Sequence, residues 1–237
     1  MSYFLYLAGL LPSLIWLSFY LRKDSHPEPN RMVLKIFFCG ILVGLPAILL
    51  EKAFEFLIKP LPVSYFVSSL LIIFLGGAFV EEYLKYLVVK VGVFKSAALD
   101  EPLDLMLYLI ISALGFAALE NVLILTNYHP TLDLGKTTEI MVWRLVSATI
   151  LHALCSALVG YFLVLAFYRL KNLPFAFWGI TIAAFLHGSY NLSIMEIKGL
   201  ERFILPLIIL ITLFFFVSSA FKKAKKMRSV CLLKEKE

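Results

Sequence analysis

Apolar residues are gathered into seven runs along the chain, and short polar segments separate these runs. The polar segments contain the Pro, Asp, Asn and Lys residues that end helices. Most of the runs have close to the 20 or so residues that a helix needs to cross the hydrocarbon core of a bilayer. The pattern predicts seven membrane-spanning helices, at residues 3–21, 33–50, 63–94, 103–126, 142–168, 174–195 and 203–221.

Three stretches are less regular. The run at 63–94 is too long for one straight span, and the segment 51–62 is a candidate interfacial helix. The polar stretch at 127–142 is expected to be a loop on the outer side of the membrane.

The composition supports a membrane protein. Hydrophobic residues make up 61% of the 237 residues and charged residues 16%, and the mean hydropathy is +0.91. In soluble domains, about 45–50% of the residues are hydrophobic and about 25% are charged. The sequence therefore predicts one all-α integral membrane domain over residues 1–237, a polytopic bundle of about seven helices. It leaves no room for a nucleotide-binding module, a zinc ribbon or a secreted disulfide scaffold.

The basic residues indicate how the chain is oriented. The net charge is +6, and the tail at 222–237 follows directly on an apolar run and carries seven basic residues, which is typical of a cytoplasmic end facing anionic lipid rather than nucleic acid. With the N-terminus outside, six basic residues lie in outer segments: Lys52, Lys59, Lys136, Arg144, Lys198 and Arg202. Fifteen lie in inner segments: Arg22, Lys23, Arg31, Lys35, Lys90, Lys95, Arg169, Lys171 and the seven of the tail. The count favours an outer N-terminus and a cytoplasmic C-terminus.

Four of the predicted spans carry polar side chains that hydrophobicity alone would exclude. A charged group at the centre of a span costs about 2.5–3.5 kcal/mol on insertion scales, so such groups need one another, a proton, a metal or water. Within each span they lie one helical turn apart or closer. They are Glu81, Glu82 and Lys85, then Glu120 and Asn121, then His152 and Ser156, and finally His187, Tyr190 and Asn191.

Depth in the membrane places these groups in one layer. At a rise of 1.5 Å per residue, Glu82, Glu120, His152 and His187 all fall between the midplane and the outer face of a core about 30 Å thick. Paired carboxylates beside a cation separate in pKa, which provides a general base and a partner acid. With two imidazoles, the set can bind a divalent metal or hold a water molecule for attack on a carbonyl.

Each polar group taken alone has a structural explanation. The charged cluster at 81–85 can be a structural ion pair, and His152 a hydrogen-bonded histidine of the bundle. Asn121, Ser156 and Asn191 can link helices through hydrogen bonds that contribute about 0.6 kcal/mol. Only the four polar stripes together indicate a functional site.

The same residues resemble a known family of intramembrane proteases, the PrsW family. Residues 81–86 (EEYLKY) are similar to its EExxK motif, 116–121 (FAALEN) to its FxxxEN motif, 152–156 to HxxxS and 187–191 (HGSYN) to its last histidine motif. The motif-bearing core is about 63–195. A distant resemblance to CAAX prenyl endopeptidases is weaker, because Lys85 stands one residue before their arginine and Glu120 replaces a histidine.

The resemblance implies hydrolysis of a peptide bond near or within the membrane. We expect Glu81 to be the general base, Glu82 its partner and Lys85 the balancing charge, with Asn191 or His187 stabilising the oxyanion. Glu120, His152 and His187 are the expected ligands of a metal, zinc by its ligand types, or they hold a water that a glutamate activates. The implied substrate is a single-span membrane protein such as an anti-sigma factor, cut near the extracytoplasmic side in regulated intramembrane proteolysis at the cell membrane.

Two other classes of function fit parts of the pattern. Buried Glu, His and Lys also build the proton or ion paths of transporters, although the sequence has no inverted repeat or matching pair of broken helices. In a membrane assembly protein the polar stripes would be interhelical hydrogen bonds alone.

Overall fold

The computed structural model describes residues 2–24, 26–128, 133–170, 172 and 174–227, and all regular structure in them is helical. The predicted basic tail lies outside the described residues from 228 on. The α-helices are α1 Ser2–Leu21, α2 Asn30–Ile58, α3 Tyr65–Leu71, α4 Val80–Gly92, α5 Pro102–Tyr128, α6 Leu134–Val146, α7 Ala148–Val164, α8 Phe175–Glu196 and α9 Ile204–Ala224. Shorter π-helical or 3₁₀ segments are η1 Ile72–Phe79, η2 Leu165–Leu170 and η3 Leu200–Phe203.

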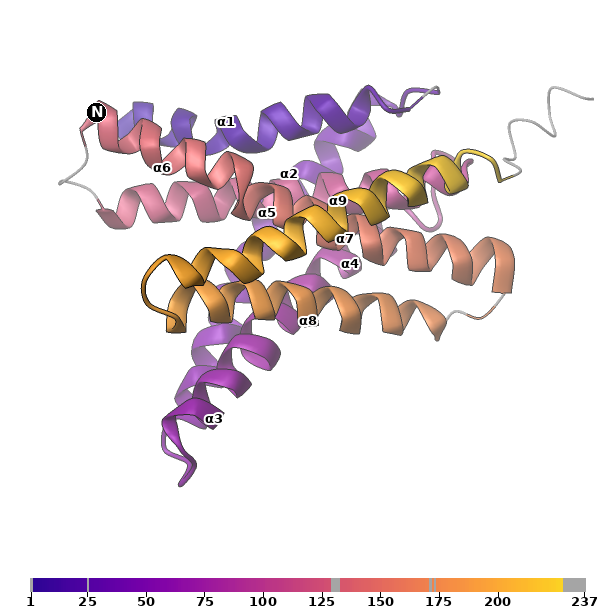
Figure 1. Ribbon diagram of the computed structural model, residues 1–237. Coiled ribbons are helices and arrows are strands. Elements are labelled where there is room, and N and C mark those ends of the chain that lie inside the picture. The colour runs from indigo at the N-terminus through magenta and orange to yellow at the C-terminus, as the bar shows by residue number, and fades with distance from the viewer. Residues whose placement is uncertain (1, 25, 129–132, 171, 173, 228–237) are drawn as a thin grey trace, which may run out of the picture.

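Two helices form the centre of the bundle. Residues 102–118 of α5 and 149–161 of α7 are all buried, as expected for helices that are apolar on every face. In Figure 1, α1 and α6 lie along one side of this pair and α8 along the other, while α9 crosses α7. Among the described residues, six helical stretches are long and apolar enough to span a membrane. With α8, the prediction of a polytopic bundle of about seven helices is confirmed.

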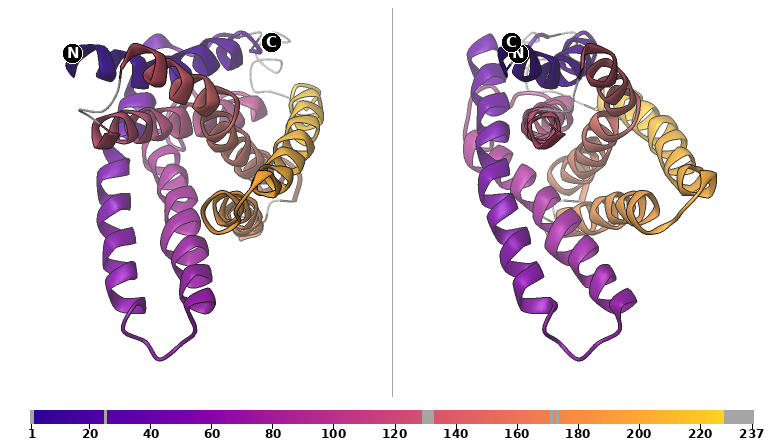
Figure 2. Two further views of the ribbon diagram at one scale, coloured as in Figure 1. Left: turned by 60° about the vertical axis from the view of Figure 1, so that its left-hand side comes forward. Right: turned by 90° about the vertical axis from the view of Figure 1, so that its left-hand side faces the viewer.

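The second and third predicted spans form a long hairpin. Figure 2 shows α2 and the α3–η1–α4 stretch extending side by side from the bundle, with their connection far from both termini. Helix α2 runs to Ile58, so most of the segment 51–62 continues a spanning helix and is not a separate interfacial one. The long run at 63–94 contains the π-helical segment η1, which ends at Phe79, two residues before Glu81.

Glycines allow the hairpin to lie close to the central helix. A Cβ at Gly40 of α2 would overlap the carbonyl oxygen of Ser112, and one at Gly115 of α5 would overlap that of Phe37. Small residues at such crossings let two backbones approach closely in a membrane. This crossing sets the position of the hairpin, and with it the position of the glutamates, relative to α5.

The segment at 127–142, predicted to be an outer loop, is partly helical in the structure. Residues 134–146 form α6, and Asp133 begins this helix by accepting a hydrogen bond from the backbone N–H of Lys136 at 2.8 Å. The helix packs against α1 and α7. It brings Arg144 to the polar residues of the core.

Candidate active site

Lys85 lies at the centre of the polar cluster and is fully buried. Its Nζ donates to Glu82 Oε1 at 2.9 Å and to Glu81 Oε2 at 3.2 Å, and it lies 2.8 Å from His152 Nδ1. The same ammonium lies 4.4 Å from the centre of the Phe116 ring. One cation therefore binds both neighbouring carboxylates and one imidazole.

Glu82 has a purely internal set of partners. Its Oε1 contacts His187 Nδ1 at 3.0 Å as well as Lys85, and its Oε2 accepts a hydrogen bond from Ser156 at 3.1 Å. Helix α8 and the segment η1 pack closely beside His187. A Cβ at Gly188 of α8 would lie 2.6 Å from the ring of Phe74 in η1. With its side chain fully buried and its oxygens engaged, Glu82 positions other groups.

Each histidine uses one ring nitrogen to bind a carboxylate and turns the other nitrogen toward Glu81. His187 Nδ1 contacts Glu82, and His152 Nε2 contacts Glu120 Oε2 at 2.8 Å. The opposite nitrogens, His187 Nε2 and His152 Nδ1, lie 3.9 Å and 3.8 Å from Glu81 Oε2. A carboxylate on one nitrogen fixes the tautomer in which the other carries a lone pair.

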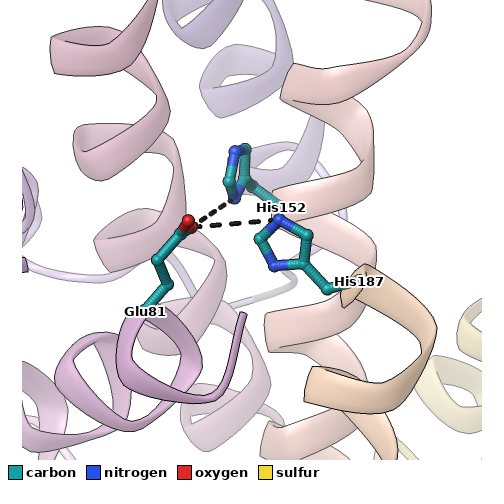
Figure 3. Close-up of side chains that lie close together, drawn as sticks. All are labelled: Glu81, His152 and His187. Carbon is teal, nitrogen blue, oxygen red and sulfur yellow. Dashed lines mark ion pairs between the residues drawn. The ribbon is translucent and has the colours of Figure 1, made fainter. Parts of the chain in front are cut away.

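Figure 3 shows how Glu81, His152 and His187 face one another from α4, α7 and α8. Their potential ligand atoms all lie within 4.8 Å of one another, and all three residues are buried. Two imidazoles and a carboxylate are ligands that zinc takes in catalytic sites. The chemistry of the donor set and the carboxylates behind both histidines therefore fit a metal ion.

The structure places Glu120 on the far side of His152 from this group. Glu120 Oε2 contacts His152 Nε2 and also Arg144 Nη2, the latter at 2.9 Å. Its neighbour Asn121 donates to Thr149 at 3.2 Å and accepts a hydrogen bond from Arg144. Glu81, rather than Glu120, thus lies with the two histidines in the group of candidate metal ligands.

Sequence reasoning overlooked Arg144 and Glu51. Arg144 was counted as a cation of an outer loop, but its side chain is only 15% exposed and is paired with Glu120. Its position two turns before His152, at the edge of the same apolar run, was the available signal. Glu51 lines a small cavity of about 190 Å³ together with Glu120, between α2 and α5.

A larger cavity reaches the site from the opposite side. Its volume is about 680 Å³, and its lining includes Glu120, His152, His187 and Asn191. Side chains of α6, α7, α8 and α9 complete its walls. It gives the imidazoles of a buried cluster a space in which a substrate can lie.

Comparison with known proteins shows the family of the chain. A family model described as PrsW family intramembrane metalloprotease matches residues 28–219, which include the whole polar cluster. The chain belongs to the PrsW family. It is 29% identical over 232 residues to the protease PrsW of Bacillus subtilis, which covers 95% of this chain and 96% of that protein. It is 31% identical over 186 residues to the protease PrsW of Geobacillus kaustophilus, covering 78% and 76%.

No solved structure is similar to this PrsW family member at a significant level. The family and the apolar helices make the chain a multi-pass membrane protein and a membrane-embedded protease. The description of the family as metalloproteases agrees with the donor group of Glu81, His152 and His187. The resemblance of the sequence motifs to the PrsW family is confirmed.

Proposed function

We propose that the chain cleaves a single-span membrane protein of the anti-sigma-factor kind, at a peptide bond near the extracytoplasmic face. The observation that carries this proposal is the pair of imidazoles, His152 and His187, which line the 680 Å³ cavity and each turn one nitrogen toward Glu81. With a metal ion bound, this set would polarise a carbonyl and activate a water molecule in a place that a peptide segment can reach.

The residues that would hold a metal are Glu81, His152 and His187. A zinc ion bound there supplies a water molecule with a pKa near 7 and a Lewis acid for the carbonyl oxygen. Glu82 and Glu120 keep the two imidazoles in the required tautomer and orientation.

In this proposal Glu81 would hold the metal through Oε2 and accept the proton of the attacking water on its other oxygen, Oε1. Its Oε2 faces the imidazoles, whereas Oε1 accepts no hydrogen bond from the described residues. The proton then passes from Glu81 to the amine that leaves when the C–N bond breaks. Lys85 balances the charge of the glutamate pair throughout.

Asn191 is proposed to bind the oxyanion. It lies one helical turn after His187 and lines the cavity. Its side-chain amide can donate a hydrogen bond to the carbonyl oxygen as negative charge develops there, which is the moment at which such a donor lowers the barrier most.

We propose that the protein lies in the cell membrane. Its N-terminus would be outside and its C-terminus in the cytoplasm. The support is the excess of basic residues in the inner segments. In this orientation the cluster lies in the outer half of the membrane, and water reaches it most directly from outside. A bond deep in a regular span would be shielded by helical hydrogen bonds and lipid, so a juxtamembrane bond is preferred.

Co-expression with a single-span anti-sigma factor tests the proposal. We expect a shortened substrate with the parent chain and with Glu139→Gln, an exposed glutamate on α6 that serves as the matched control. Glu81→Gln should accumulate normally and cleave about 10²–10⁴-fold more slowly, because the amide keeps the size of the side chain but cannot take a proton. Equal cleavage by Glu81→Gln, or cleavage on the cytoplasmic side of the substrate's span, would contradict it.

A further inference from the structure

The 680 Å³ cavity has two chemically different walls. The wall on α7 and α8 carries His152, His187 and Asn191, together with Glu120 of α5. The opposite wall is apolar and comes mainly from the start of α9, with Pro206, Leu207 and Leu210. A peptide lying in the cavity therefore meets the polar cluster on one side and an aliphatic surface on the other.

The size of the cavity limits what it can hold. A 20-residue transmembrane helix is about 30 Å long and 10 Å wide, which corresponds to roughly 2,400 Å³. The cavity, of about 680 Å³, is smaller than this. It accommodates a segment of a few residues, and the rest of a substrate span must remain outside it.

Two arginines line the same cavity, and they differ in their partners. Arg144 is neutralised by Glu120, to which its Nη2 donates at 2.9 Å. Arg202 has no carboxylate partner among the described residues, and its guanidinium lies 4.7 Å from the centre of the Phe203 ring. Phe203 in turn stacks on Trp143 at 6.3 Å, which links the start of α9 to α6. Arg202 is thus an exposed cation, seated on an aromatic pair at the edge of the cavity.

We propose that the cavity binds a short juxtamembrane segment that carries an acidic side chain, and that Arg202 selects this residue. An arginine fork matches a carboxylate in a bidentate pair, and such charge-assisted hydrogen bonds are stronger than neutral ones. The aliphatic wall of α9 then holds an apolar neighbour of the acidic residue. This inference rests on the proposed function, because it specifies what the same site takes.

A charge-swap experiment tests the inference. The full-length enzyme in proteoliposomes is given the single-span anti-sigma factor, and versions of it in which each acidic juxtamembrane residue is changed to its amide or to Lys. At one position the acidic form should have a kcat/KM about tenfold above the amide form. In Arg202→Ala this ratio should fall to about one, and in Arg202→Lys it should take an intermediate value, because lysine keeps the charge but not the bidentate fork.

Two further variants make the outcome decisive. Arg202→Glu should prefer the Lys form of the substrate over the acidic form, a reversal that loss of folding cannot produce. Lys198→Ala removes an exposed cation nearby that does not line the cavity, and it should keep the parent ratio. Absence of cleavage by the parent enzyme would overturn the proposed function, whereas cleavage with the same ratios in every Arg202 variant would overturn this inference alone.

Discussion

Removal of the buried ammonium of Lys85 gives the sharpest test of how the cluster is stabilised. Lys85→Met keeps an unbranched apolar side chain of similar length but removes Nζ. The substitution leaves Glu81 and Glu82 side by side inside the bundle, with no cation to replace contacts of 3.2 Å and 2.9 Å. It also removes the contact with His152.

The expected loss is large because the charges are buried. Removing one partner of a buried ion pair costs about 3–5 kcal/mol, since the other charge stays behind without compensation. Surface substitutions usually change stability by less than about 0.5 kcal/mol. Lys90→Met on the same helix is the matched control, because Lys90 is exposed.

The free energy of unfolding in detergent micelles measures both variants. Lys85→Met should lower it by about 3–5 kcal/mol and Lys90→Met by less than about 0.5 kcal/mol. Adding Glu82→Gln to Lys85→Met should restore part of the loss, because it removes one of the uncompensated charges. A Lys85→Met protein as stable as the Lys90→Met control would show that the ammonium does not stabilise the carboxylates.

Four further predictions follow from the fold and the site. Gly115→Leu should prevent accumulation of folded protein, measured by detergent-resistant purification, whereas Gly77→Ala should be tolerated because its added carbon has 3.6 Å of space. Burial raises the pKa of Glu28 from 4.5 to about 7, so its contribution to stability is present below pH 4.5 and is lost as the pH rises toward 7. Glu28→Gln should reduce the fall in the free energy of unfolding between pH 4.5 and pH 7. Purified protein should hold about one equivalent of metal by elemental analysis, His152→Ala should hold much less, and full activity after chelation would contradict a metal mechanism. A reporter fused after Glu237 should read cytoplasmic, and an extracytoplasmic reading would overturn the orientation.

The fold followed from the sequence wherever the membrane imposes the pattern. Lipid requires long apolar helices, so the runs that become α1, α5 and α9 could be read directly. Helix α6 was missed because its Lys, Thr and Glu residues have the polarity of a loop. Asp133, whose side chain caps the first turn of α6, was a local signal of where this helix starts.

The site could be predicted as a set of residues but not as a geometry. Spacing put Glu81 and Lys85 on one face of a helix, and depth put both histidines in the same layer. Which nitrogen of His152 meets Glu120 and which meets Glu81 depends on the rotation of α7 between α4 and α5. That rotation is set by packing between helices, which a single sequence does not encode locally.

The balance of charge connects the stability of the cluster to its chemistry. Glu81, Glu82 and Glu120 are compensated by the two cations Lys85 and Arg144, so with neutral imidazoles the cluster has an excess of one negative charge. Buried charge without compensation is costly, and the excess favours the uptake of a proton or a metal cation. Because Lys85 already contacts Nδ1 of His152, a cation bound by Glu81 and the histidines competes with the ammonium for that lone pair. Glu82 offers the ammonium a second partner at 2.9 Å, which gives the second of the two adjacent glutamates a role in the cluster.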